Sequence, residues 1–98
     1  LRRLAAGADF LIESERPGRM AETGLGYGDL QAIQPGLVCV SITPFGQTGS
    51  KAHWLASDLT QMAAGGFAYL TGGANDPPTR ICVPQAHAHA GADAAIGR

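Results

Sequence analysis

The run Leu37-Val38-Cys39-Val40-Ser41-Ile42 decides the fold that this sequence predicts. It is continuously apolar and rich in β-branched residues, and it does not alternate with polar ones, which is typical of a strand covered on both faces. A second apolar run, Ala8–Ser14, is bounded by polar residues and followed by Pro17-Gly18. We therefore expect two buried strands, one at each run.

Short helices are expected between the two strands. Arg19–Thr23 suits a short helix that ends at Gly24, and Asp29 suits the N-cap of another helix that ends at Pro35-Gly36. A strand, a helical crossover and a second strand form a βαβ unit, whose strands are parallel and whose connection is nearly always right-handed. The sequence thus predicts an α/β fold with an open parallel sheet and helical crossovers.

Helices are also expected at both ends of the chain. Leu1, Leu4, Ala5 and Ala8 form a helical stripe with no capping residue before it, and Ala86–Arg98 predicts a helix with no terminating signal. Because the chain also starts without methionine, we expect residues 1–98 to be one partial domain from a longer protein.

The segment between the second strand and the last helix predicts a helix and a long loop. Ser57 or Asp58 can cap a helix that runs to about Ala64, where Gly65-Gly66 interrupts it, and Phe67–Leu70 packs next. Residues 71–79, which contain Gly-Gly and Pro-Pro pairs, predict a loop, and residues 80–84 a short extended piece.

Composition excludes several classes of protein. Seven Lys and Arg against eight Asp and Glu leave a net charge of −1, with no basic patch for nucleic acid. A hydrophobic content of 45% with 15% charged residues argues against disorder, and no apolar run is long enough to span a membrane. Cys39 and Cys82 lie in separate apolar runs, so we expect buried free thiols and a reducing, cytoplasmic compartment.

Two loops are the expected ligand edge, because open parallel sheets bind ligands at the carboxyl ends of their strands. In the first loop, Arg16 can bind phosphate or carboxylate, or can pair locally with a nearby glutamate, Glu13, Glu15 or Glu22. In the second, residues 43–49, Phe45 can pack against a flat ligand ring or cover the sheet edge. Gly46 and Gly49 of that loop allow close approach of a ligand, or make the turn.

Other motifs give weaker signals. Residues 24–28 read GxGxG and not GxGxxG, so turn glycines are the favoured interpretation, and the sequence holds no P-loop. His87 and His89 are two apart on a helix and project about 200° from each other, so we predict no metal site there. A single histidine at this helix end can still reach a cleft, or simply pack, and Asp58 is either catalytic or an N-cap.

An ordered series of motifs resembles the family III CoA-transferases, relatives of formyl-CoA transferase and α-methylacyl-CoA racemase. The series covers nearly the whole chain and includes, in order, Glu13 to Gly18, Gly24 to Tyr27, Leu30 to Pro35, Val40 to Gly49, Ser57-Asp58, Gly65-Gly66, Leu70 to Gly72, Pro77-Pro78 and Val83 to Gly91. The resemblance implies a fragment of the N-terminal half of a longer CoA-transferase, taken from its Rossmann-like large domain, with two subunits interlocked as a homodimer.

The resemblance also implies the substrates. Coenzyme A and its acyl thioesters are substrates rather than tightly bound cofactors, and a carboxylic acid accepts the CoA. In the family an aspartate attacks the thioester to form an acyl-aspartyl anhydride, which CoA thiolate then attacks, so that one acyl transfer is split into smaller steps. The residues implied to bind CoA are those of the two loops: Ser14, Glu15, Arg16, Pro17, Gly18, Phe45 and Gly46.

Several positions depart from the family pattern. His87 falls where the resemblance places the catalytic aspartate, and Glu22 falls where several relatives have a CoA-contacting arginine. Ser14-Glu15 replaces an Asn-Phe or Gly-Tyr pair, and Ser57 replaces the catalytic histidine of the racemase branch. Four hypotheses follow: a CoA-transferase that uses His87 or residues outside residues 1–98, a CoA-thioester-binding domain without catalysis, an acyl-CoA racemase relative, and a generic nucleotide-binding module.

Overall fold

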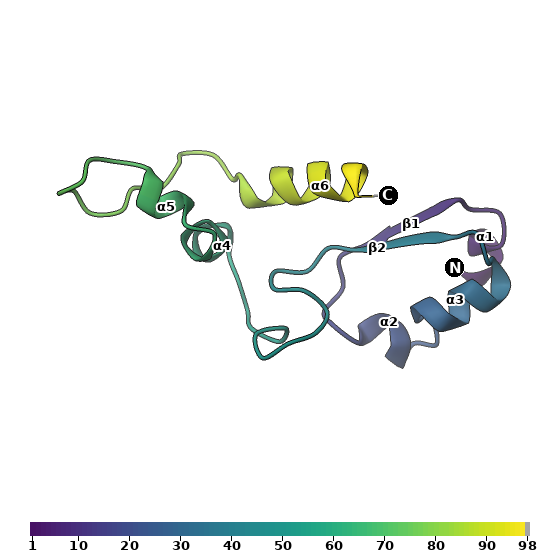
Figure 1. The fold of residues 1–98 in the computed structure, drawn as a ribbon. Helices are drawn as coiled ribbons and strands as arrows, with labels where there is room; N and C mark the ends of the chain where they lie inside the picture. Colours follow the sequence, from purple (N-terminus) through teal and green to yellow (C-terminus); the bar gives the residue numbers. More distant parts are fainter. Residues whose placement is uncertain (98) are drawn as a thin grey trace. The chain divides into compact units, whose positions relative to one another are not determined.

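Two short strands pair in parallel in the first half of the chain. In the computed structural model, which describes residues 1–97, β1 (Phe10–Glu13) pairs with β2 (Val38–Ser41) so that Phe10 lies opposite Val38 and Glu13 opposite Ser41. Figure 1 shows the two strands side by side, with the helical connection leading from one to the other. The predicted parallel strand-helix-strand unit is confirmed, and the fold is mixed α/β.

The helices of this region are α1 (Arg2–Ala5), α2 (Arg19–Glu22) and α3 (Tyr27–Ile33). The predicted N-cap of α3 is wrong by three residues, because the helix starts after Gly26 and Asp29 lies in its first turn. The Asp29 carboxylate accepts a hydrogen bond of 3.1 Å from the backbone N–H of Gly26. Asp29 therefore stabilises the helix start as the glutamate of a capping box does, from inside the helix.

A small apolar core lies between the helices and one face of the strand pair. Leu30 of α3 is 1% exposed and packs with Ala5 of α1 and with Leu37 just before β2. Leu11 and Cys39, which are partners in the strand register, pack against this cluster. The helical crossover thus covers the strand face that carries Leu11 and Cys39.

The expectation of a buried strand is wrong for β1, and β2, expected to be covered on both faces, is only half-buried over residues 38–40. Phe10 and Ile12 of β1 are 48% and 62% exposed, whereas Leu11 between them is half-buried. Successive strand residues point to opposite faces, so the face that carries Phe10 and Ile12 is the one away from the core. An apolar run without alternation therefore does not predict which face of a strand is covered by other residues of the same chain.

The structure divides into two compact units, Leu1–Trp54 and Leu55–Gly97. The second contains α4 (Asp58–Ala64), α5 (Phe67–Leu70) and α6 (Ala86–Ile96), which are labelled in Figure 1. Ser57, and not Asp58, is the N-cap of α4, and its hydroxyl accepts from the backbone N–H of Thr60 at 3.3 Å. Residues 80–84 form neither a helix nor a strand.

The two cysteines differ in their surroundings. Both are free; Cys39 is half-buried in β2, whereas Cys82 is exposed, so the prediction of a buried thiol is wrong for Cys82. Cys82 lies in the segment 80–84, which forms neither a helix nor a strand. Burial raises the pKa of the Cys39 thiol, and the negative charge of Glu13 raises it further. Within residues 1–97 no helix is long and apolar enough to cross a membrane.

Replacing Leu30 by alanine is expected to lower the free energy of unfolding by about 2–5 kcal/mol, because it removes the most buried side chain of the core. Urea denaturation followed by circular dichroism measures the change. Gln31→Ala is the matched control, since Gln31 is the exposed next residue of α3 and its loss should cost less than about 0.5 kcal/mol. Equal effects of the two substitutions would contradict this core.

Iodoacetamide is expected to alkylate Cys82 faster than Cys39 near neutral pH. The thiolate is the reactive form, and the raised pKa and partial burial of Cys39 lower its thiolate fraction and its accessibility. Peptide mass spectrometry over a time course separates the two sites, with Cys39→Ala as the control for assignment. Faster modification of Cys39 would contradict the described environment of β2.

Candidate functional site

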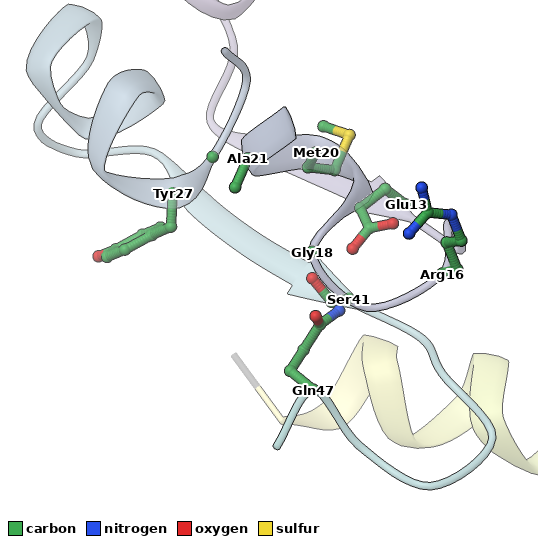
Figure 2. A pocket seen from close by; sticks show the side chains of 9 residues that line it. Glu13, Arg16, Gly18, Met20, Ala21, Tyr27, Ser41 and Gln47 are labelled. Atoms are coloured by element: carbon green, nitrogen blue, oxygen red, sulfur yellow. The ribbon is translucent and has the colours of Figure 1, made fainter. Parts of the chain in front are cut away.

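The loops that leave β1 and β2 start at the same edge of the sheet. Because the strands are parallel, their last residues, Glu13 and Ser41, are register partners, and the chain leaves both in the same direction. A hollow of about 200 Å³ lies at this edge. Figure 2 shows Arg16 from the first loop and Gln47 from the second on its wall. The structure thus brings the two predicted ligand loops together.

Two of the seven residues expected to bind CoA, Arg16 and Gly18, line this hollow. Ser14, Glu15, Pro17, Phe45 and Gly46 belong to the same two loops but are not among its lining residues. The remaining wall is built by residues that sequence reasoning did not select: Glu13, Met20, Ala21, Gly26, Tyr27, Ser41 and Gln47. Glu13 and Ser41 had a usable signal, since the last residues of two parallel strands must meet at the ligand edge.

The first loop is held in shape by its backbone. Gly18 has a φ of 83°, a conformation that favours glycine, and directly precedes α2. Pro17 before it is buried, and the Glu13 carboxylate accepts a hydrogen bond of 2.6 Å from the backbone N–H of Glu15. Pro17 and Gly18 therefore fix the path of the loop, and this path directs Arg16 to the hollow.

Arg16 makes the local ion pair that was one of its two predicted roles. Its Nη2 donates to Oε2 of Glu22 at 2.7 Å, and Nη1 of Arg19 lies 3.4 Å from the same oxygen. All three side chains are about half exposed to solvent, so the pairs are readily exchanged for other partners. The guanidinium groups of Arg19 and of Arg16, which lines the hollow, therefore share one carboxylate.

The hydrogen bond from Arg16 lowers the pKa of the Glu22 carboxyl below its usual value, and the charge of Arg16 and the neighbouring Arg19 lower it further. The carboxylate is consequently charged at neutral pH. Two positive charges, those of Arg16 and Arg19, therefore surround this one negative charge.

The second loop carries an aromatic pair. The ring of Phe45 meets Trp54 edge to face, with centroids 6.0 Å apart and an interplanar angle of 77°. Nζ of Lys51 lies 5.3 Å from the centroid of the Trp54 ring. Gly46 has a φ of 84°, so it makes the turn that follows Phe45. Phe45 thus packs against a residue that follows the second loop, and its role toward a ligand stays a prediction.

His87 lies in the second unit, in the first turn of α6, where it is exposed. The ring of His89 packs against Phe67 of α5 with centroids 6.1 Å apart. The two imidazoles point to different sides of the helix, because residues two apart on a helix project about 200° from each other. Among residues 1–97 no three His, Cys, Asp or Glu side chains are grouped to hold a metal ion.

The family model of CoA-transferase family III matches residues 1–97. The chain belongs to CoA-transferase family III. It is 46% identical over 96 residues to the BbsE subunit of succinyl-CoA:(R)-benzylsuccinate CoA-transferase from Thauera aromatica. The matched residues are 98% of this chain and 23% of that protein. It is 36% identical over 97 residues to succinyl-CoA–D-citramalate CoA-transferase from Chloroflexus aurantiacus, covering 99% of this chain and 24% of that protein.

Solved structures of related proteins have the same fold over this region. A CaiB/BaiF family protein from Brucella suis superposes with a TM-score of 0.78 at 33% sequence identity, over 99% of this chain and 29% of that one. A protein from Mycobacterium tuberculosis superposes with a TM-score of 0.75 at 30% identity, over 96% of this chain. The chain thus spans about a quarter of the length of the family III CoA-transferases that it matches.

Arg16→Gln is expected to raise the pKa of Glu22 toward its ordinary value of 4.5, because it removes the hydrogen bond that lowers this pKa most. The ion pair stabilises the fold above the ordinary pKa, and this contribution is lost as the pH falls through the lowered value. Carboxyl carbon shifts in an NMR titration measure the change. Arg3→Gln, on α1, is the control; a Glu22 midpoint that Arg16→Gln leaves unchanged would contradict the pairing.

Proposed function

We propose that this chain forms part of the CoA-thioester site of a CoA-transferase, which moves CoA between an acyl-CoA and a carboxylic acid. The observation that carries the proposal is the hollow at the sheet edge, where the loops after two parallel strands meet in a chain of this family. In the whole protein the sheet extends as a Rossmann-like large domain, and two subunits interlock as a homodimer in the cytoplasm.

Arg16 of the first loop and Arg19 at the start of α2 suit the anionic end of the substrate. CoA carries phosphate groups, and a guanidinium fork binds phosphate through paired hydrogen bonds. Arg16 and Arg19 already bind one carboxylate oxygen of Glu22 in a solvent-exposed ion pair. A phosphate is a stronger multiple acceptor than this single oxygen, so it can take over Arg16 while Glu22 stays with Arg19.

His87 is the proposed reactive group of this branch. A neutral imidazole nitrogen can attack the thioester carbonyl, with CoA thiolate leaving, to give a cationic N-acylimidazolium. The acceptor carboxylate then attacks this acyl group and displaces the imidazole, which forms a mixed anhydride. CoA thiolate attacks the acceptor carbonyl of the anhydride, so that the new thioester forms and the donor acid leaves. Backbone N–H groups can stabilise the oxyanion of each step.

A second function is favoured by one observation at the same position. The resemblance places the catalytic aspartate of the family at His87, and a relative of this chain is named as a subunit of an enzyme rather than as a whole enzyme. The chain is then part of a subunit that binds a CoA thioester while a partner subunit supplies the catalytic carboxylate. A racemase is less favoured, because Ser57 stands where that branch has its catalytic histidine.

Turnover by the whole protein, with succinyl-CoA as donor and a panel of carboxylic acids as acceptors, is expected to fall at least about a hundredfold in His87→Ala. Hydroxylamine trapping of an acyl-enzyme is expected in the parent and not in the variant. His89→Ala is the control, since His89 packs against Phe67. CoA-thioester binding without turnover by the parent would support the subunit function, and tight NAD or ATP binding without competition by CoA would overturn both.

Arg16→Ala is expected to weaken CoA binding about tenfold, since a charge-assisted hydrogen bond contributes roughly 1.5–3 kcal/mol, part of which Arg19 retains. Isothermal titration calorimetry at low and high salt measures the effect, and parent affinity should fall as salt rises. Arg3→Ala, on α1, serves as the control. An affinity that neither Arg16→Ala nor salt alters would place the CoA phosphates elsewhere.

A further inference from the structure

The amino end of α6 is held by a side chain from another helix. Oδ1 of Asp58, the first residue of α4, accepts a hydrogen bond of 2.9 Å from the backbone N–H of Ala86, the first residue of α6. The two residues are 28 positions apart in the sequence, and the bond is partly buried. Asp58 therefore ties together two helices of the second unit that the sequence keeps far apart.

This bond replaces the cap that α6 does not make for itself. The first N–H groups of a helix have no partner within the helix and are usually satisfied by the N-cap side chain. The N-cap residue here is Gln85, whose backbone is helical and whose side chain makes no capping hydrogen bond. The Asp58 carboxylate supplies that acceptor instead, and its negative charge at a helix amino end is favourable.

Asp58 is itself held in place by the start of α4. Ser57 performs the capping of that helix: its backbone N–H donates to Oγ1 of Thr60 at 2.7 Å, and its hydroxyl accepts from the Thr60 N–H at 3.3 Å. This reciprocal pair leaves the Asp58 carboxylate available for Ala86. The capping of α4 by Ser57 and the capping of α6 by Asp58 are therefore separate tasks of neighbouring residues.

The held end of α6 is the turn that carries His87. Ala86, whose N–H binds Asp58, directly precedes His87, and His89 in the next part of the helix packs on Phe67. These two contacts fix both the start of the helix and its rotation about its axis. Without the first of them the opening turn can fray, as uncapped helix ends do, and the backbone that carries His87 is no longer held.

We propose that Asp58 is a positioning residue, whose carboxylate holds the first turn of α6 so that the His87 side chain is fixed for reaction. The catalytic consequence rests on the proposed function of His87, whereas the anchoring of α6 does not. Asp58 acts through a hydrogen bond that needs an acceptor oxygen and not a reactive carboxylate. This requirement separates a positioning role from a direct chemical one.

Steady-state kinetics of the whole protein, with succinyl-CoA as donor, test the consequence for turnover. Asp58→Ala is expected to lower kcat about 10–100-fold with KM changed less than about twofold, since misplacing a reactive group by about 1 Å can cost about a hundredfold. Asp58→Asn keeps an acceptor oxygen and is expected to retain most of kcat. The control is Asp93→Ala, an exposed aspartate on α6 itself. Equal losses in Asp58→Asn and Asp58→Ala would overturn the proposal, as would an effect on KM alone.

Amide hydrogen exchange tests the anchor independently of turnover. In the whole protein, Asp58→Ala is expected to speed exchange in residues 86–89 at least about tenfold relative to the parent, whereas Asp58→Asn and Asp93→Ala are not. Unchanged exchange in Asp58→Ala would overturn the anchor. Full turnover by His87→Ala, or no turnover by the parent, would overturn the proposed role of His87. The exchange measurement would still show whether Asp58 holds the first turn of α6.

A third variant covers the case in which Asp58→Ala does not fold. Asp58→Glu keeps the charge but places the carboxylate one methylene farther from α4, which displaces or breaks its bond to Ala86. We expect faster exchange in residues 86–89 and a lower kcat for this variant. Parent-like exchange and kcat in Asp58→Glu would overturn the proposal.

Discussion

The parallel pairing of β1 with β2 is the constraint on which the candidate site depends. The pairing sets Glu13 opposite Ser41, so the loops that follow both strands leave from one edge of the sheet. An antiparallel pair would send them to opposite edges, and Arg16 could not share a wall with Gln47. The crossover that makes the pairing parallel also brings Leu30 of α3 into the core, where it packs with Ala5 of α1 beside the strands, so one arrangement builds both core and site.

Two carboxylates, those of Glu22 and Asp58, position groups that the strand pairing alone does not hold. In the first unit, Glu22 pairs with Arg19 and with Arg16, which lines the hollow. In the second unit, Asp58 holds the start of α6. Each of these carboxylates acts on groups that carry the proposed chemistry and does not lie at the reacting atoms itself. Glu22 and Asp58 therefore act as ion-pair and hydrogen-bond partners of these groups.

Sequence patterns located the elements better than they described their surroundings. The runs at 8–14 and 37–42 correctly predicted two strands, because β-branched apolar residues favour strands wherever they pack. The same runs wrongly predicted a buried strand for β1 and full coverage of both faces for β2, because burial depends on which elements lie nearby and not on the strand alone. Asp29 and Cys82 were misassigned for a similar reason. Aspartate is a common N-cap residue and cysteine a common core residue, but here Asp29 lies in the first turn of α3 and Cys82 is exposed.

The sequence by itself determined the strands, the helices between and after them, the family resemblance, and the two loops from which a ligand site is built. Only the tertiary structure decided that Arg16 pairs with Glu22 and that Phe45 packs on Trp54. It alone showed Asp58, 28 residues before Ala86, capping α6 in place of Gln85. Local patterns arise from the preferences of neighbouring residues, whereas these partners are chosen by the path of the folded chain, which no short stretch of sequence contains.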